Sequence, residues 1–326
     1  MENEMKRAII TGPTGVIGMA LIEYLCEKNI QVIAVVRGDS KRKNQIRESE
    51  NIVKIDCSLD NIGKLPKKVK LALKEKNWNV EQPIDVFYHF AWAGTSKNDR
   101  NDVYLQEQNI KYALHAVDAA SELNCRIFVG AGSQAEYGRY EGVLKAETPA
   151  FPEISYGAAK LCAGQMTRIR CEQKNIKHIW TRILSVYGPY NSWDTMIMDM
   201  IHKMLLRERA ACTKGGQMWD YLYAKDAAKM MYLLGEKGVH GKTYCVGSGI
   251  VKPIKEYIEI IRNTVNPQAE VGYGDIEYLP RQIMYLCADI GELIKDTEFE
   301  PEYSFEAGIR ETVEWCKCNM REREQI

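Results

Sequence analysis

Three glycines spaced three residues apart, at positions 12, 15 and 18, constrain the fold of this chain more than any other feature. The apolar run before them predicts a short buried strand, and the periodic run after them predicts a helix over about residues 15–28. Glycines between a strand and a helix let the backbone turn tightly and approach a pyrophosphate at the helix N-terminus. The spacing differs from the usual Gly-x-Gly-x-x-Gly fingerprint, but its strand–turn–helix context favours a dinucleotide site over an ordinary loop. We expect the contacts of this turn to come from Gly12, Thr14, Gly15, Val16, Ile17 and Gly18.

Strand and helix patterns alternate through the first half of the chain, which is typical of a doubly wound parallel sheet. The expected strands are continuous apolar runs, as strands covered on both faces should be. They span residues 6–11, 31–37, 51–56, 84–90, 126–131 and 178–184, with helices at 15–28, 59–76, 99–123 and 155–174. We therefore predict an α/β fold with a Rossmann-type NAD(P)-binding domain at residues 1–187. A smaller C-terminal α/β substrate lobe at 188–326 follows, and some of its segments are expected to return to the first domain.

The bulk composition is that of a soluble globular protein, with 45% hydrophobic and 27% charged residues. The net charge is zero, so no overall field attracts nucleic acid or an anionic membrane. No apolar run reaches the ~18–20 residues of a membrane span. The ten cysteines are scattered without a Cys-x-x-Cys pair, and only five histidines occur. We expect a cytoplasmic protein with reduced thiols and no metal site.

Tyr156 and Lys160 stand four residues apart in a predicted helix, so their side chains share one face. An ammonium beside a phenol favours the phenolate, and we expect Lys160 to lower the pKa of Tyr156 from its ordinary value near ~10. Such a tyrosine can exchange a proton with a carbonyl or alcohol oxygen while hydride moves on the carbon. Ser133 lies 23 positions upstream and completes a candidate catalytic trio. The Tyr-x-x-x-Lys pattern also occurs on solvated helix faces, and the glycine turn is what favours catalysis.

Four further segments extend this pattern, with the sequences FYHFAWAG at 87–94, AGSQAEYG at 131–138, RILSVYGP at 182–189 and DYLYAKD at 220–226. With the glycine turn and the trio, they resemble the short-chain dehydrogenase/reductase superfamily, specifically its extended branch of nucleotide-sugar epimerases, dehydratases and reductases. The resemblance runs from residue 7 to about residue 315. It implies an NAD(P)-dependent enzyme with a nucleotide-sugar substrate, in which Ala91 and Asn109 join Tyr156 and Lys160 at the cofactor. It also implies a homodimer that pairs helices 99–123 and 155–174.

The end of the second strand bears on the choice of dinucleotide. NAD enzymes of this type carry an acidic residue roughly 20 positions after the glycines. Val36 occupies that position here and Arg37 follows it, and a guanidinium suits the 2′-phosphate of NADP. We expect NADP, with NAD as the alternative because a shift of three residues makes Asp39 the ribose acceptor. Asp56 resembles the adenine-contacting aspartate of the family, although it could also cap the next helix.

Departures from the family pattern bear on the reaction. Dehydratases of this branch carry an Asp-Glu pair after the serine or threonine, whereas this chain has Gln134 and Ala135, which cannot supply an acid and a base. We expect Glu136 to face away from the site because it lies in a strand-like stretch. Since Arg37 favours exchangeable NADPH, we predict reduction of the 4-keto group of a nucleoside-diphosphate 4-keto-6-deoxyhexose. The alternative is an NAD-dependent nucleotide-sugar 4-epimerase; a reductase of a hydrophobic ketone and a non-catalytic nucleotide sensor are weaker alternatives.

The remaining predictions concern the substrate. Arg281 follows a proline where relatives place an arginine on the substrate pyrophosphate. Trp219 stands where the family commonly has an arginine, so one phosphate or ribose contact is lost, and Trp219 either stacks on a ring or packs in the core. Trp92 replaces a small residue and is expected to narrow the pocket. The predicted substrate contacts are Trp92, Thr95, Gln134, Ser185, Trp219 and Arg281.

Overall fold

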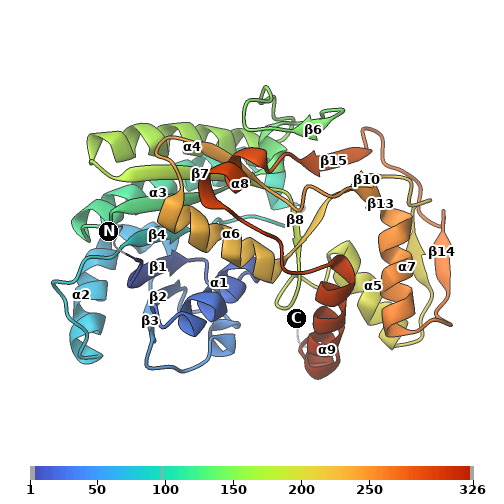
Figure 1. Cartoon of the computed structure of the whole chain (residues 1–326), viewed down its shortest axis with the longest axis horizontal. Helices are drawn as coiled ribbons and strands as arrows, with labels where there is room; N and C mark the ends of the chain where they lie inside the picture. Colours follow the sequence, from blue (N-terminus) through green and yellow to red (C-terminus); the bar gives the residue numbers. More distant parts are fainter. Residues whose placement is uncertain (1–3, 97, 324–326) are drawn as a thin grey trace.

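The computed structural model describes residues 4–96 and 98–323. Its main layer is a seven-stranded sheet in the order β12-β7-β5-β4-β1-β2-β3, with every neighbouring pair parallel (Figure 1). The chain winds outward in opposite directions from β1 and β4, which confirms the predicted doubly wound α/β fold. The strands are β1 (Arg7–Thr11), β2 (Gln31–Val36), β3 (Ile52–Asp56), β4 (Val86–His89), β5 (Ile127–Ser133), β7 (Lys177–Ile183) and β12 (Thr243–Val246).

Helices cover both faces of this sheet, which is why its strands are apolar throughout. Along β1, Ala8 and Ile10 pack into one buried cluster while Ile9 packs into another, because successive side chains point to opposite faces. The first cluster is covered by α1 (Val16–Glu27) and α6 (Ala224–Lys237), and the second by α2 (Leu65–Glu75), α3 (Val103–Glu122) and α4 (Ser155–Gln173). Both α6 and β12 come from the chain after residue 188, yet they belong to this first layer.

A smaller lobe packs beside the carboxyl ends of the main strands (Figure 1). Its core lies between three helices, α5 (Met196–Leu205), α7 (Ile254–Val265) and α9 (Phe305–Arg323). Three methionines of α5, Met198, Met200 and Met204, are buried in this core. Short strands form three small sheets outside the main layer, and α8 (Gly291–Thr297) packs beside α6. These strands are β6 (Val143–Leu144), β8 (Ser185–Tyr187), β9 (Ala210–Cys212), β10 (Met218–Trp219), β11 (Tyr221–Tyr223), β13 (Lys252–Pro253), β14 (Val271–Tyr273) and β15 (Tyr285–Ala288).

Two of the predicted helices begin with 3-10 turns instead of α-helix. The helix expected at 59–76 is a 3-10 helix over Leu59–Lys64 followed by α2, and the helix expected at 99–123 starts as a 3-10 turn, η3 (Asp99–Asn101). Asp102 then starts α3, since its carboxylate accepts the N–H groups of Tyr104 and Leu105. Short 3-10 turns at helix starts leave little trace in the apolar periodicity.

The strand-like conformation expected around Glu136 is wrong. Residues Gln134–Glu136 form a 3-10 turn, η4, in which the Ser133 hydroxyl accepts the N–H of Ala135. The carboxylate of Glu136 accepts the N–H of Ser133 in return, so the two side chains close a capping box. The expected consequence still holds, because Glu136 is fully buried and turns into the interior.

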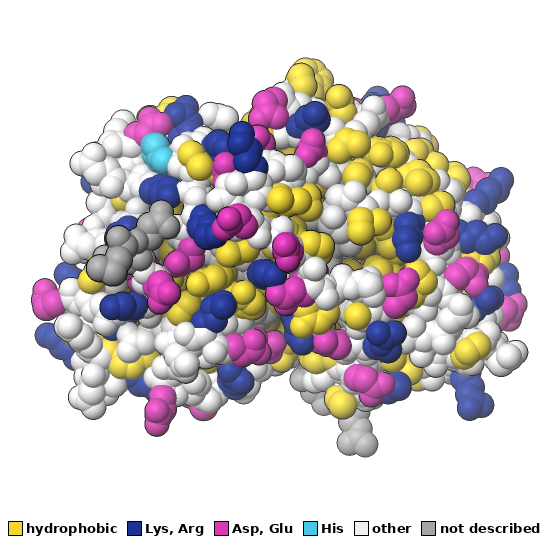
Figure 2. All heavy atoms as spheres, in the orientation of Figure 1, with side chains coloured by type: hydrophobic (Ala, Val, Ile, Leu, Met, Phe, Trp, Pro, Cys, Tyr) yellow, Lys and Arg dark blue, Asp and Glu magenta, His cyan; other side chains and the backbone are white. Residues whose placement is uncertain are grey.

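No helix within the described part of the chain combines the length and apolar character needed to cross a membrane. On the face shown in Figure 2, basic and acidic side chains are interspersed without a large area of one sign. This distribution matches the zero net charge of the sequence.

The close packing of the glycine turn makes a testable prediction about stability. A Cβ at Gly18 would lie 2.6 Å from the carbonyl oxygen of Gly12 and 2.8 Å from the backbone of Pro13. We expect Gly18→Ala to destabilise the protein by about 1–3 kcal/mol, because neither backbone atom can move aside cheaply. Gly63→Ala is the matched control, since a Cβ there meets nothing within 4 Å. Equal urea midpoints for the two variants would contradict this packing.

Candidate active site

A cavity of about 860 Å³ opens where the carboxyl ends of β1, β4 and β5 face α4, β8 and α5. This is the crevice at which open α/β sheets bind their ligands. The predicted site residues that line it are Gly12, Gly15, Val16, Ile17, Gly18, Trp92, Thr95, Ser133, Gln134, Tyr156, Lys160, Ser185 and Trp219. The predicted residues that do not line it are Thr14, Arg37, Asp56, Ala91, Asn109 and Arg281.

The glycine turn forms one wall of the cavity and fits a dinucleotide. Gly12 has φ +69°, and a Cβ there would lie 2.7 Å from the backbone nitrogen of Ala91. Gly15 is the N-cap of α1 and supplies no side-chain cap, so the first N–H groups of the helix remain available to an anion. Ala91 therefore supports the turn through its backbone, while Thr14 is partly exposed beside it. Glycine is required at position 12 because its φ is positive and a Cβ there would collide with the backbone of Ala91.

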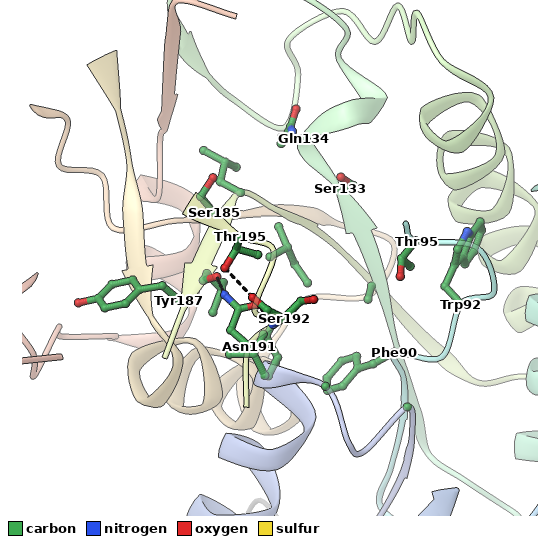
Figure 3. A pocket seen from close by; sticks show the side chains of 18 of the residues that line it. Phe90, Trp92, Thr95, Ser133, Gln134, Ser185, Tyr187, Asn191, Ser192 and Thr195 are labelled. Atoms are coloured by element: carbon green, nitrogen blue, oxygen red, sulfur yellow. Dashed lines mark hydrogen bonds between the residues drawn. The ribbon is translucent and has the colours of Figure 1, made fainter. Parts of the chain in front are cut away.

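Asn109 lies beneath the loop that follows β4 and hydrogen-bonds to its backbone. It is buried on α3, its side-chain oxygen accepts the N–H of Ala93 at 2.9 Å, and its amide donates to the Ala93 carbonyl at 2.9 Å. This pair of hydrogen bonds fixes the loop that carries Trp92 and Thr95 to the cavity. Figure 3 shows these two residues across the cavity from Ser185 and Thr195, with Ser133 at the end of β5.

Tyr156 and Lys160 lie on the floor of the cavity, one helical turn apart on α4. Both are buried, with exposed fractions of 9% and 3%. The Lys160 Nζ donates to the carbonyl of Ala131 at 2.7 Å and lies 3.7 Å from the ring centre of Trp92. Burial lowers the pKa of Lys160 to about 7, although the carboxylate of Glu136 opposes this shift.

The predicted effect of Lys160 on Tyr156 is wrong for this arrangement. Burial raises the pKa of Tyr156, and the influences that oppose burial are the guanidinium of Arg100 and a hydrogen bond with Ser133. The Lys160 ammonium is held by Ala131 and Trp92, 5.7 Å from the centre of the Tyr156 ring. The phenol consequently stays protonated in the ordinary pH range, as a proton donor must.

A buried ion pair between Arg182 and Glu136 holds the backbone of Ser133 in place. The Arg182 Nε donates to the Glu136 carboxylate at 2.8 Å, and the Trp180 Nε1 donates to the same carboxylate at 3.0 Å. Burial raises the pKa of Glu136 although Arg182 lowers it. Because Glu136 also accepts the N–H of Ser133, this cluster fixes the end of β5. Sequence reasoning missed the pair, since Glu136 and Arg182 are 46 positions apart.

The residues expected at the substrate separate into two groups. The Trp219 Nε1 donates to the Ser185 hydroxyl at 2.8 Å, so these two predicted contacts form one wall of the cavity, while Gln134 lies beside Ser133. Arg281 is exposed outside the cavity lining, and its backbone has φ +68°. Its positive charge acts on Glu153, whose pKa is lowered chiefly by a hydrogen bond from Arg139.

The predicted adenosine contacts lie at the ends of β2 and β3. The side chain of Arg37 is 67% exposed and its Nε lies 3.8 Å from the carboxylate of Asp39. Asp56 is exposed at the end of β3, and a Cβ at Gly38 would collide with its carboxylate. Val36 and Asp56 pair across the two strands, so Arg37 and Asp56 lie on the same edge of the sheet.

A family model described as the NAD dependent epimerase/dehydratase family matches residues 8–247. The chain belongs to this family. The match confirms the predicted extended short-chain dehydrogenase/reductase resemblance, the enzyme prediction and the use of a nicotinamide dinucleotide.

Individual relatives are distant but nearly full length. Protein CapI of Staphylococcus aureus is 23% identical, with 95% of this chain and 98% of that protein aligned. CDP-abequose synthase of Salmonella typhimurium is 24% identical, with 93% and 96% aligned. The solved UDP-N-acetylglucosamine 4-epimerase of Methanobrevibacter ruminantium M1, in complex with UDP-N-acetylmuramic acid, superposes with a TM-score of 0.84 at 23% identity, covering 98% of this chain and 100% of that one. At this identity the structural likeness establishes the fold, and the reaction has to be argued from the site.

The buried ion pair makes a testable prediction. Arg182→Met leaves the Glu136 carboxylate buried without its cation, and we expect unfolding free energy to fall by about 3–5 kcal/mol. Arg168→Met is the matched control, because Arg168 makes an (i,i+4) pair with Glu172 on the surface of α4. That change should cost about 0.5 kcal/mol or less. Urea denaturation followed by circular dichroism measures both, and similar midpoints would contradict the role given to the buried pair.

Proposed function

We propose that the protein reduces the 4-keto group of a nucleoside-diphosphate 4-keto-6-deoxyhexose with NADPH. The observation that carries this proposal is the pairing of Tyr156 and Ser133 on the cavity floor, next to Gln134 and Ala135. A phenol and a hydroxyl can protonate and bind one carbonyl oxygen, whereas an amide and a methyl cannot drive elimination of water. The relative named CDP-abequose synthase supports a product that is a nucleoside-diphosphate sugar.

The side chains then have separate roles. Bound NADPH supplies the hydride that reduces the C4 carbon. Tyr156 donates its hydroxyl proton to the C4 oxygen, and Ser133 donates a hydrogen bond to the same oxygen. Lys160 binds the nicotinamide ribose from the floor of the cavity. The glycine turn and the N-terminus of α1 bind the cofactor pyrophosphate, supported by Ala91 and Asn109.

Polar and aromatic groups around the floor are proposed to bind the substrate. Thr95 and Gln134 bind hydroxyl groups of the hexose, and the Ser185–Trp219 pair binds the nucleotide end. Trp92 limits the space beside Tyr156, since the two rings make an edge-on contact at 6.2 Å. Arg281, on the loop before β15, is proposed to bind the substrate diphosphate.

Arg37 supports NADP over NAD as the cofactor. Its guanidinium is exposed at the end of β2, where the adenosine 2′-phosphate of NADP would be recognised, with Asp56 at the adenine. A 4-epimerase that retains NAD is the second candidate, because Asp39 beside Arg37 offers a carboxylate for an unphosphorylated ribose. The solved 4-epimerase with the same fold supports this alternative.

We also propose that the protein forms a homodimer through α3 and α4. These adjacent helices expose large apolar side chains, including Tyr104 on α3 and Ile169 on α4, with exposed fractions of 80% and 47%. Exposed apolar groups on adjacent helices favour association of two copies.

The proposed reaction is tested by supplying NADPH with a panel of nucleoside-diphosphate 4-keto-6-deoxyhexoses, alongside UDP-glucose and UDP-galactose. We expect NADPH oxidation only with a keto sugar, and a loss of at least about 100-fold in turnover for Tyr156→Phe. Tyr140→Phe is the control, because Tyr140 is partly exposed outside the cavity lining. Interconversion of the UDP-hexoses without net cofactor use would establish the epimerase instead.

The cofactor assignment makes a separate prediction. Arg37→Ala should raise the KM for NADPH about tenfold, equivalent to ~1.4 kcal/mol, while the KM for NADH changes little. Lys64→Ala removes an exposed cation whose ammonium donates to Asn61, and it should leave both values unchanged. A wild-type preference for NADH that Arg37→Ala does not alter would overturn the assignment of NADP.

A further inference from the structure

Arg100 lies at the edge of the cavity beside Tyr156, and neither the trio nor the glycine turn accounts for it. Its guanidinium carbon is 5.0 Å from the centre of the Tyr156 ring, and its Nε donates to the carbonyl of Thr95 at 3.1 Å. The turn η3 that carries it is joined to α4, because the Asn101 side chain accepts the N–H of Ser155 at 3.2 Å. The residue that follows Arg100 is therefore hydrogen-bonded to the residue that precedes Tyr156.

The acidic neighbours of Arg100 are engaged with other partners. Asp99 accepts a hydrogen bond from the Ser96 hydroxyl at 2.7 Å, and Asp102 caps the start of α3. Within residues 4–96 and 98–323, Arg100 forms no ion pair. An exposed guanidinium that is oriented but not neutralised keeps its positive charge directed at the nearest ring.

Lys160, the other cation that lines the described part of the cavity, has a different orientation. Trp92 holds its ammonium against the indole face at 3.7 Å, and the Ala131 carbonyl accepts its hydrogen bond. The indole is fixed in turn, since its Nε1 donates to the buried side chain of Gln106 at 2.8 Å. The ammonium held in this way also lies 5.7 Å from the centre of the Tyr156 ring.

The charged groups that face Tyr156 from the surrounding elements act in opposite directions. Burial raises its pKa most, Arg100 on η3 lowers it, a hydrogen bond with Ser133 on β5 lowers it, and Glu136 on η4 raises it. Lys160 on α4 lies 5.7 Å from the ring centre, and the Trp92 edge carries no charge. The influences that oppose burial therefore include a cation outside the Tyr-x-x-x-Lys motif.

We propose that Arg100 is a positioning residue for Tyr156: it orients the phenol and stabilises the negative charge left when Tyr156 gives up its proton. This role rests on the proposed function. In that step the O–H bond of Tyr156 breaks, its electron pair stays on the phenolate oxygen, and the proton forms the O–H bond of the product alcohol. The phenolate then takes a proton from water. Arg100 acts here in addition to Lys160, which lies 5.7 Å from the centre of the same ring.

The inference is tested first without any reaction. Proteins carrying ¹³Cζ-tyrosine are titrated by NMR, and the Tyr156 signal is identified by its loss in Tyr156→Phe. We expect Arg100→Gln to move ionisation of Tyr156 to higher pH by about one pH unit, and Arg100→Lys to restore most of the wild-type titration. Arg168→Gln is the control, because it removes an arginine on the far part of α4.

The dependence of turnover on pH is the second test. Because the phenol must be protonated, turnover falls as pH rises through its pKa, and Arg100→Gln should move this alkaline limb to higher pH. At neutral pH we expect kcat to fall about threefold to tenfold with little change in KM. An unchanged Tyr156 titration in Arg100→Gln overturns the inference, whatever the activity. Full turnover by Tyr156→Phe would overturn the proposed function instead. The NMR titration would still test the influence of Arg100 on Tyr156, because it does not depend on the reaction.

Discussion

The buried ammonium of Lys160 is the interaction on which the rest of the cavity floor depends. A cation taken out of water needs compensating partners, and three parts of the chain supply them: the carbonyl of Ala131 on β5, the face of Trp92 after β4, and the more distant charge of Glu136 on η4. Meeting this requirement brings the ends of β4, β5 and α4 together. Ser133 and Tyr156 are fixed relative to each other as a consequence.

Local sequence signals were sufficient for the fold and for much of the floor. The glycine turn predicted the first strand–helix unit, since only glycine tolerates the close approach of Gly12 to Ala91. Continuous apolar strands predicted a sheet covered on both faces, and the four-residue spacing placed Tyr156 and Lys160 on one face of α4. These features depend on neighbours in the sequence, which is why the sequence alone could predict them.

Other features depend on contacts between distant segments. The direction of the Lys160 ammonium is set by Trp92, and the fold of η4 is set by the attraction of Glu136 to Arg182. No period or motif encodes either pairing, so the pKa direction of Tyr156 and the local conformation after Ser133 were predicted wrongly. Arg100 was missed for the same reason: it precedes a helix cap in the sequence and contacts the site only through tertiary packing. The positions of the Arg100 and Lys160 charges around Tyr156 are therefore set by the folded chain.

We propose that the cavity carries out one net reduction at C4 of a nucleotide sugar. Its most direct test uses NADPH deuterated at the transferred C4 position, followed by NMR and mass spectrometry of the sugar. We expect one deuterium at C4 of the product for each NADP formed. A sugar product without deuterium, formed while the labelled cofactor remains unconsumed, would contradict it.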